Sequence, residues 1–304
     1  MTARRGLRVP PAIMRRAAGQ LGGRALDPAL PWPVQRTRLD QATRIAVLPR
    51  GTTVTEQTIA GLRADVVCSR AAGSGLTVIH FHGGGYCLGS AGTARAWAAH
   101  LSARTGCRVV LPEYRLAPEH PYPAALEDAR AVLTELSGAG PVVVSGDSAG
   151  GGLALALVLS LRDAGQELPA GCILLSPWLD LGRDRRGVPD LVRHDVLLSP
   201  DWLEACARAY VEPARFAEPL ISPLSGTHGG LPPLLIQAGT DELLAPDAGL
   251  LAASASAAGV DVTYTRWPRM WHDFPLQAGL LAAADSAVTQ AAWFVGKVTA
   301  GLTT

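Results

Sequence analysis

The stretch Pro141–Leu161, PVVVSGDSAGGGLALALVLSL, decides the fold. A short β-branched run ends in the G-x-S-x-G motif Gly146–Gly150, and an apolar helical pattern follows at once. A strand that turns sharply into a helix at such a motif is the setting of a nucleophile elbow, in which small glycines let the turn hold the serine in a strained conformation. The stretch therefore predicts that Ser148 is a nucleophile at the edge of a sheet and at the N-terminus of a helix. A glycine-rich loop at a helix start is the alternative, since a chain with 33 glycines can match the motif by chance.

Strand and helix patterns alternate along most of the chain, which predicts a mostly parallel sheet of eight strands with helices on both faces. Most strand patterns are nearly continuous apolar runs, as in buried parallel strands, whereas the last alternates and suits a strand nearer the edge. The expected strands are Thr43–Pro49, Leu62–Arg70, Leu76–His82, Cys107–Tyr114, Pro141–Ser145, Gly171–Ser176, Leu234–Ala238 and Val260–Trp267. The expected helices are Ala94–Ala103, Ala124–Leu136, Gly151–Asp163, Ala248–Ala258 and Gln277–Ala300.

Two segments, residues 1–42 and 181–220, fall outside this alternation. The second carries its own helical pattern at Ser199–Val211. Ligands of open α/β sheets bind beyond the carboxyl ends of the strands, so we expect these segments to form a lid there. The core would then comprise residues 43–180 and 221–304.

A serine nucleophile needs a base and a carboxylate that orients the base, and after an elbow they follow in the order Ser, Asp or Glu, His. Of the histidines downstream of Ser148, only His272 follows the last strand pattern and precedes the last helix. Asp241 is the first carboxylate after the strand Leu234–Ala238 and is the expected acid, with Glu242 as its competitor.

The run His82-Gly83-Gly84-Gly85-Tyr86 ends another predicted strand. Glycines expose backbone N–H groups without side chains in the way, and these could bind an oxyanion together with the N–H of Ala149. The run lacks the spacing of a dinucleotide site and the lysine of a phosphate loop. His80 and His82 share one strand face, but no third metal ligand is evident, so a structural role is favoured and no metal or organic cofactor is expected.

Composition narrows the class of protein. The chain has 304 residues, 48% of them hydrophobic and 17% charged, with a net charge of +1. This favours a folded α/β protein and argues against a dedicated nucleic-acid binder. Five scattered cysteines fit a reducing compartment, and no apolar run is long enough for a membrane span, so we expect a cytoplasmic location. The basic start, with Arg5, Arg15 and Arg16, leaves peripheral membrane contact open.

Together these motifs resemble the hormone-sensitive-lipase-like carboxylesterases, bacterial family IV, and their actinobacterial esterase and lipase paralogues. The resemblance rests on HGGGY, then YRLAPEHPYPAALED (Tyr114–Asp128), then GDSAGG, and runs from about residue 60 to the end. It implies an α/β-hydrolase core, a helical cap built from the N-terminal segment and an insertion after the sixth strand, and a possible homodimer through the edge of the last strand. It also implies oxyanion donors at Gly83, Gly84 and Ala149 and a structural role for His82.

Two positions depart from the family pattern. The acid motif is usually Asp-Pro-Leu but reads Asp241-Glu242-Leu243 here, and the base motif is often His-Gly-Phe but reads His272-Asp273-Phe274. The extra carboxylates could alter the preference for the alcohol part of the substrate or the pH optimum.

The sequence therefore predicts a serine carboxylesterase that cleaves short- to medium-chain esters through an acyl-enzyme, with Ser148, His272 and Asp241 as the triad. A catalytically silent small-molecule receptor, or an amidase or deacetylase with the same triad, are the alternatives. The expected pocket walls are Tyr86, Leu88, Trp178, Trp202, Tyr210, Leu244 and Phe274.

Overall fold

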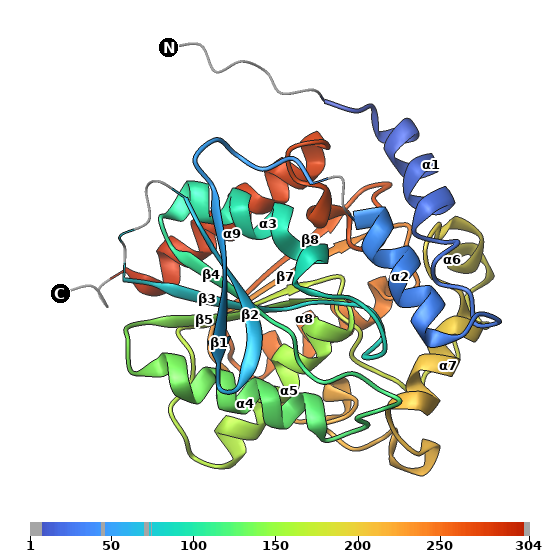
Figure 1. The fold of residues 1–304 in the computed structure, drawn as a ribbon. Helices are drawn as coiled ribbons and strands as arrows, with labels where there is room; N and C mark the ends of the chain where they lie inside the picture. The colour runs from blue at the N-terminus through green and yellow to red at the C-terminus, as the bar shows by residue number, and fades with distance from the viewer. Residues whose placement is uncertain (1–7, 44–45, 70–72, 74, 301–304) are drawn as a thin grey trace.

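An eight-stranded sheet forms the centre of the computed structural model, which describes residues 8–43, 46–69, 73 and 75–300 (Figure 1). The strand order is β1-β2-β4-β3-β5-β6-β7-β8. β2 pairs antiparallel with β1 and β4, and the remaining pairs are parallel. The strands are β1 (Thr53–Ile59), β2 (Leu62–Cys68), β3 (Thr77–Phe81), β4 (Arg108–Pro112), β5 (Val142–Asp147), β6 (Gly171–Leu175), β7 (Leu234–Gly239) and β8 (Val262–Trp267).

Helices cover both faces of this sheet and bury its central strands. α3 (Ala91–Thr105) and α9 (Ala282–Thr299) pack on one face, and α4 (Ala124–Ser137), α5 (Ala149–Asp163) and α8 (Ala245–Ala257) lie on the other (Figure 1). Every residue of β3, β5, β6 and β7 is buried, which is why these strands read as continuous apolar runs. β8 is half-buried and ends the sheet, as its alternating sequence predicts.

The first strand differs from the prediction. Thr43–Pro49 was expected as a strand, but residues 46–50 form none, and residues 44 and 45 lie outside the described part. β1 is instead the polar run TVTEQTI, exposed at all but its last position. It is the outer arm of a hairpin that turns through Ala60 and Gly61, both at positive φ. A strand held by a hairpin at the sheet edge needs no apolar face, so apolar periodicity does not reveal it.

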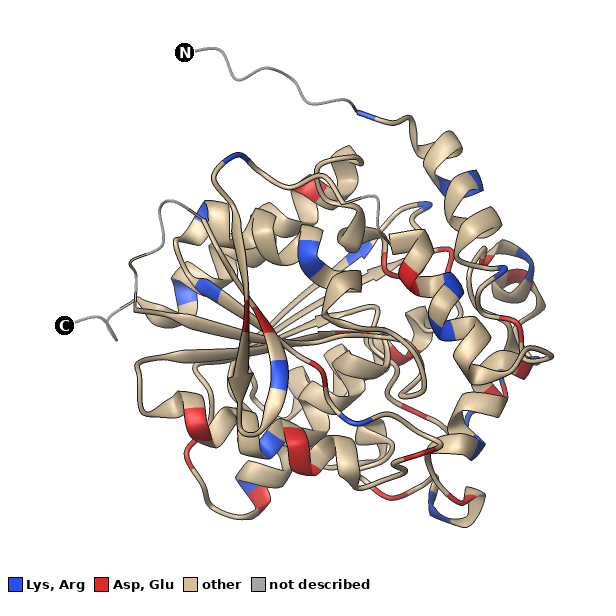
Figure 2. Ribbon diagram, viewed as in Figure 1, with Lys and Arg blue, Asp and Glu red and all other residues tan. Residues whose placement is uncertain are grey.

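Four further helices gather at one side of the molecule, on the right of Figure 1. They are α1 (Pro11–Leu21), α2 (Trp32–Thr43), α6 (Pro189–His194) and α7 (Pro200–Tyr210). The N-terminal pair, α1 and α2, is joined to the later pair, α6 and α7, by a hydrogen bond. Trp202 of α7 donates its indole N–H to Gln35 of α2 at 2.9 Å. Charged residues of both signs mark these helices, whereas the central strands are largely uncharged (Figure 2). Three short 3-10 turns, η1 (Pro213–Arg215), η2 (Pro223–Ser225) and η3 (Phe274–Gln277), complete the fold.

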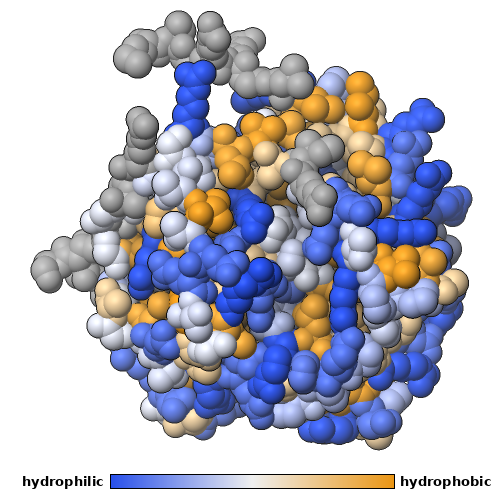
Figure 3. Space-filling model, in the orientation of Figure 1, coloured by the Kyte–Doolittle hydropathy of each residue, from blue (hydrophilic) through white to orange (hydrophobic). Residues whose placement is uncertain are grey.

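Apolar side chains are exposed on and beside the first two helices, notably Ile13, Leu21, Val34 and Val47. Figure 3 shows hydrophobic patches on this part of the surface, broken by polar residues. Among the described residues, no helix combines the length and apolar character needed to cross a membrane.

Candidate active site

Ser148 stands at the sharp turn between β5 and α5. Its backbone has φ 52° and ψ −121°, a conformation that L residues rarely adopt, and its N–H donates to the carbonyl of Leu175 at 2.9 Å. The flanking glycines make the turn possible. A Cβ on Gly146 would lie 2.1 Å from the Gly150 oxygen, and one on Gly150 would lie 2.0 Å from the Phe81 oxygen. The sequence thus places the serine hydroxyl beyond the end of a central strand, at the N-terminus of a helix.

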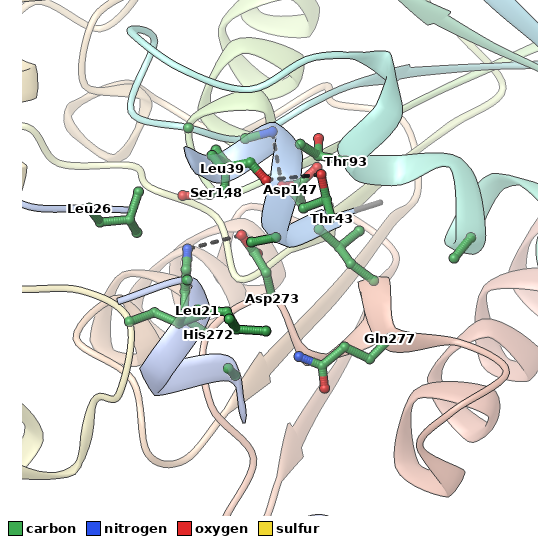
Figure 4. A pocket seen from close by; sticks show the side chains of 18 of the residues that line it. Leu21, Leu26, Leu39, Thr43, Thr93, Asp147, Ser148, His272, Asp273 and Gln277 are labelled. Carbon is green, nitrogen blue, oxygen red and sulfur yellow. Dashed lines mark hydrogen bonds and ion pairs between the residues drawn. The ribbon is translucent and has the colours of Figure 1, made fainter. Parts of the chain in front are cut away.

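His272 lies in the loop after β8 and is buried between two carboxylates. Its Nδ1 is 3.3 Å from Oε2 of Glu242. Its Nε2 is 3.1 Å from Oδ2 of Asp273, a contact that Figure 4 shows. Burial lowers the pKa of His272, but the charges of Asp273 and Glu242 outweigh burial and raise it well above its ordinary value. The imidazole therefore sits in a strongly anionic setting.

The carboxylate next to His272 is Glu242, and the prediction that Asp241 fills this place is wrong. Asp241 turns away from the ring, and its Oδ2 forms an ion pair with Nη1 of Arg15 in α1 at 2.9 Å. Glu242 is fully buried and accepts a hydrogen bond from the Ser176 hydroxyl at 2.8 Å. Burial raises the pKa of Glu242, while His272 and Ser176 oppose the rise. The two neighbours project to opposite sides of one turn, which sequence order alone does not distinguish.

Asp195, from the segment between α6 and α7, holds the loop that carries Glu242. Its Oδ2 accepts the N–H of Leu243 at 2.8 Å, and its Oδ1 accepts those of Leu197 and Leu198 at 2.9 Å. Burial raises the pKa of this carboxyl. The side chain of Asp195 therefore links the insertion to the acid loop through the hydrogen bond from the Leu243 N–H.

The glycine run behind the serine is braced by Asp147. The Gly83 N–H donates to Oδ2 of Asp147 at 2.9 Å, and Oδ1 of Asp147 is 2.9 Å from Nε2 of His80. Since Gly83 has one N–H and a carboxylate holds it, the prediction of Gly83 as an oxyanion donor is wrong. Gly84, at φ 119°, lines the same cavity as Ser148, so its N–H is still a candidate oxyanion donor.

The other histidines weighed from the sequence are held by protein groups elsewhere. His80 also contacts the Ser145 hydroxyl at 3.0 Å, and His82 stacks on Tyr114 with ring centroids 4.4 Å apart. His194 contacts the carbonyl of Asp190, and His228 contacts Ser254 and Pro223. Only His272 adjoins the cavity that Ser148 lines, among the described residues.

A cavity of about 480 Å³ opens over Ser148 and His272. Its walls come from α1, α2, the start of α3, the glycine run after β3, the start of α7 with the segment before it, and the loop and turn after β8, and they are mainly apolar. They include Met14, Ala17, Ala18, Leu21, Leu26, Leu39, Thr93, Leu197, Leu198, Trp202, Leu276 and Gln277. Figure 4 shows several of these side chains around the serine and histidine.

Of the predicted pocket walls, only Trp202 lines this cavity. The other six are core residues at most 2% exposed: Tyr86, Leu88, Trp178, Tyr210, Leu244 and Phe274. Tyr86 stacks on Tyr210 with centroids 3.9 Å apart, so the aromatic rings fill each other's space and leave none for a ligand. One wall of the cavity, formed by Met14, Ala17, Ala18 and Leu21 of α1, was not predicted. These residues recur at helical spacing, a signal that could have revealed the wall.

This fold and site define a class. A sequence model described as alpha/beta hydrolase fold matches residues 78–276, and the chain belongs to that family. Within it, the chain is a hormone-sensitive-lipase-like, bacterial family IV carboxylesterase. It is similar to the putative acetyl-hydrolase LipR of Mycobacterium tuberculosis, with 39% identity covering 84% of this chain and 83% of LipR. An acetyl-hydrolase of Streptomyces hygroscopicus shares 38% identity, over 74% of this chain and 77% of its own.

Solved structures agree with this placement. The crystal structure of an esterase from the bacterial hormone-sensitive lipase family superposes with a TM-score of 0.88 and 32% identity, covering 95% of this chain and 99% of that one. A hormone-sensitive lipase from a metagenome library gives a TM-score of 0.87 at 31% identity, covering 96% and 99%. The chain is a serine hydrolase of carboxylic esters.

Proposed function

We propose that Ser148, His272 and Glu242 form the catalytic triad, with the N–H groups of Gly84 and Ala149 as the oxyanion hole. The observation that carries this assignment is the 3.3 Å separation of Glu242 and His272 Nδ1, while Asp241 pairs with Arg15. Such a distance is ordinary for a resting site, whose hydrogen bonds tighten when substrate binds. Glu242 fixes the ring orientation and stabilises the imidazolium that forms.

The reaction then follows the usual two steps of acyl transfer. His272 takes the hydroxyl proton as Ser148 attacks the ester carbonyl, and the oxyanion develops against the two N–H groups. His272 gives the proton to the leaving alcohol oxygen, which releases the alcohol and leaves an acyl-enzyme. Water, activated by the same histidine, hydrolyses the acyl-enzyme and restores the serine.

The substrates we infer are esters with short- to medium-chain acyl groups. A cavity of about 480 Å³ lies in the ordinary range for small-molecule sites, and its mainly apolar walls suit an acyl chain. Acetyl-hydrolase is also the name carried by two of the relatives.

The test is hydrolysis of p-nitrophenyl esters from acetyl to palmitoyl by the wild type and by Ser148→Ala. We expect turnover that peaks among the shorter chains and disappears in the variant. Equal rates on palmitoyl and acetyl esters would refute the chain-length proposal. Turnover retained by a folded Ser148→Ala protein would refute the nucleophile.

The proposed setting of this enzyme has three further parts. The described parts of residues 1–42 and 181–220 form a cap over a core made of the described parts of 43–180 and 221–304, which the cavity walls from α1, α2 and Trp202 support. A homodimer forms through the outer edge of β8, which ends the sheet. Light scattering of the purified protein tests this dimer.

The enzyme works in a reducing, cytoplasmic setting, since all five cysteines are free thiols. Arg5, one of the basic residues weighed for membrane contact, lies outside the described residues.

A further inference from the structure

Asp273 places a carboxylate directly against the catalytic histidine. Its backbone is left-handed, with φ 53° and ψ 27°, and its N–H donates to the Ser176 hydroxyl at 3.2 Å. This conformation turns the side chain back, so that Oδ2 lies 3.1 Å from Nε2 of the preceding His272 (Figure 4). Nε2 is the nitrogen that must accept the Ser148 proton.

The contact favours a proton between its two atoms. A carboxylate oxygen and an unprotonated imidazole nitrogen are both acceptors and repel each other at 3.1 Å, so the ion pair favours a proton at Nε2. While that proton is held, Nε2 has no lone pair to offer to Ser148. The pair between His272 and Asp273 therefore has to open before the histidine can act as a base.

Asp273 also has binding capacity that the protein does not use. Its Oδ1 is buried and has no hydrogen-bond partner among the described residues, a state that is costly for a carboxylate. The other acid in the cavity wall, Asp147, is already paired through both oxygens, with His80 and with Gly83. No lysine or arginine belongs to the described cavity wall.

Asp273 belongs to an anionic group of residues. Glu242 flanks the other side of the ring, Asp195 lies behind the Glu242 loop, and Asp147 stands across the serine turn. Glu242 and Asp273 both contact His272, whereas Asp147 is paired with His80 and Gly83. A positive charge brought in by a ligand would therefore be stabilised in this cavity, and a negative one repelled.

We propose that Asp273 recognises a protonated amine in the alcohol portion of the ester and that this pairing frees His272 for catalysis. The inference rests on the proposed triad. The ammonium N–H donates to the Asp273 carboxylate, the proton formerly held at Nε2 leaves to solvent through the cavity mouth, and Nε2 turns its lone pair to the Ser148 hydroxyl. The alcohol side is assigned because Nε2 protonates the leaving oxygen, so groups near Asp273 belong to the leaving alcohol. The probe chosen below carries its amine two carbons from the ester oxygen.

The test compares two acetate esters of the same shape, 2-(dimethylamino)ethyl acetate and 3-methylbutyl acetate, at a pH that keeps the amine protonated. Acid release in a pH-stat gives kcat/KM for each. For the wild type we expect kcat/KM to favour the amine ester by about ten-fold or more, the size of one charge-assisted hydrogen bond. In Asp273→Asn, which tolerates the left-handed backbone equally well, the ratio falls to near one.

Asp261→Asn is the matched control, since it removes one carboxylate from the exposed pair with Lys297, far from the cavity, and leaves the ratio unchanged. Asp273→Gly is the second variant if Asn disturbs folding, because glycine accepts positive φ without strain. A wild-type ratio near one, or a ratio preserved in both Asp273 variants, would overturn the inference. If the wild type hydrolyses neither these esters nor p-nitrophenyl acetate, the proposed function itself has failed, and this inference fails with it.

Discussion

Replacing Glu242 by Gln tests which of two adjacent carboxylates serves the histidine. Glu242 is fully buried, lies 3.3 Å from Nδ1 of His272 and receives the Ser176 hydroxyl, so its amide analogue keeps the shape and loses the charge. In serine triads, loss of the orienting carboxylate lowers kcat roughly 10⁴-fold, since the wrong tautomer is favoured and the imidazolium is left without its partner. We expect a loss of that order for Glu242→Gln on p-nitrophenyl acetate.

The matched variant is Asp241→Asn, one residue earlier. Asp241 and Arg15 are partly exposed, with side chains 22% and 25% accessible, and such pairs contribute up to about 1 kcal/mol. That corresponds to a change of at most about five-fold even if all of it appeared in the rate. Circular dichroism of both variants shows whether each is folded. A 10⁴-fold loss in Asp241→Asn together with near-normal turnover in Glu242→Gln would refute the assignment.

Three further changes test other parts of the site. Asp273 raises the pKa of His272, and His272 must be unprotonated to act as a base, so we expect wild-type kcat/KM to increase as the pH rises through this pKa. In a pH–rate profile, Asp273→Asn shifts this ascending limb to lower pH. Gly83→Ala would bring a Cβ to 2.3 Å from Asp147 Oδ2 and displace the neighbouring Gly84, whose N–H we propose as an oxyanion donor. We therefore expect kcat on p-nitrophenyl acetate to fall by about 100-fold or more, as on loss of such a donor, with an unchanged fold by circular dichroism. Arg15→Ala releases α1 from the acid loop, and we expect KM to rise more than kcat falls; a purely kcat effect would contradict a role in closing the cavity.

The fold was readable from sequence wherever a segment is buried on both sides. β3, β5, β6 and β7 have continuous apolar runs because helices cover both faces, and each lies within a residue or two of its prediction. The prediction of the first strand failed because the side chains of β1 mostly face solvent and its pairing comes from a hairpin turn. Hydrophobic periodicity measures burial, so it does not detect an element that the core does not require.

The site followed a similar division. Chain order and the adjoining strands constrain Ser148 and His272, and the structure places both at one cavity. Sequence order did not show which carboxylate lies beside His272, because Asp241 and Glu242 both follow β7. What separates them is a partner of Asp241 that is 226 residues away, Arg15. Six of the seven expected pocket walls are core residues instead, since large apolar side chains occur in cores and pockets alike.

The carboxylates around His272 differ in how the protein neutralises each of them. Asp241 has an arginine, and Oε2 of Glu242 has a hydroxyl and the imidazole. Oε1 of Glu242 is buried without a hydrogen-bond partner among the described residues, but Glu242 does not line the cavity, whereas Asp273 does. Asp273 has only the imidazole, through the atom that catalysis needs, and its remaining oxygen is buried without a partner among the described residues. Burial accordingly raises the pKa of Asp273 to about 8 against the opposing pull of His272. A buried carboxylate with an unpaired oxygen raises the free energy of the resting enzyme. A substrate that supplies a positive charge would pair with this carboxylate and release the base in the same step.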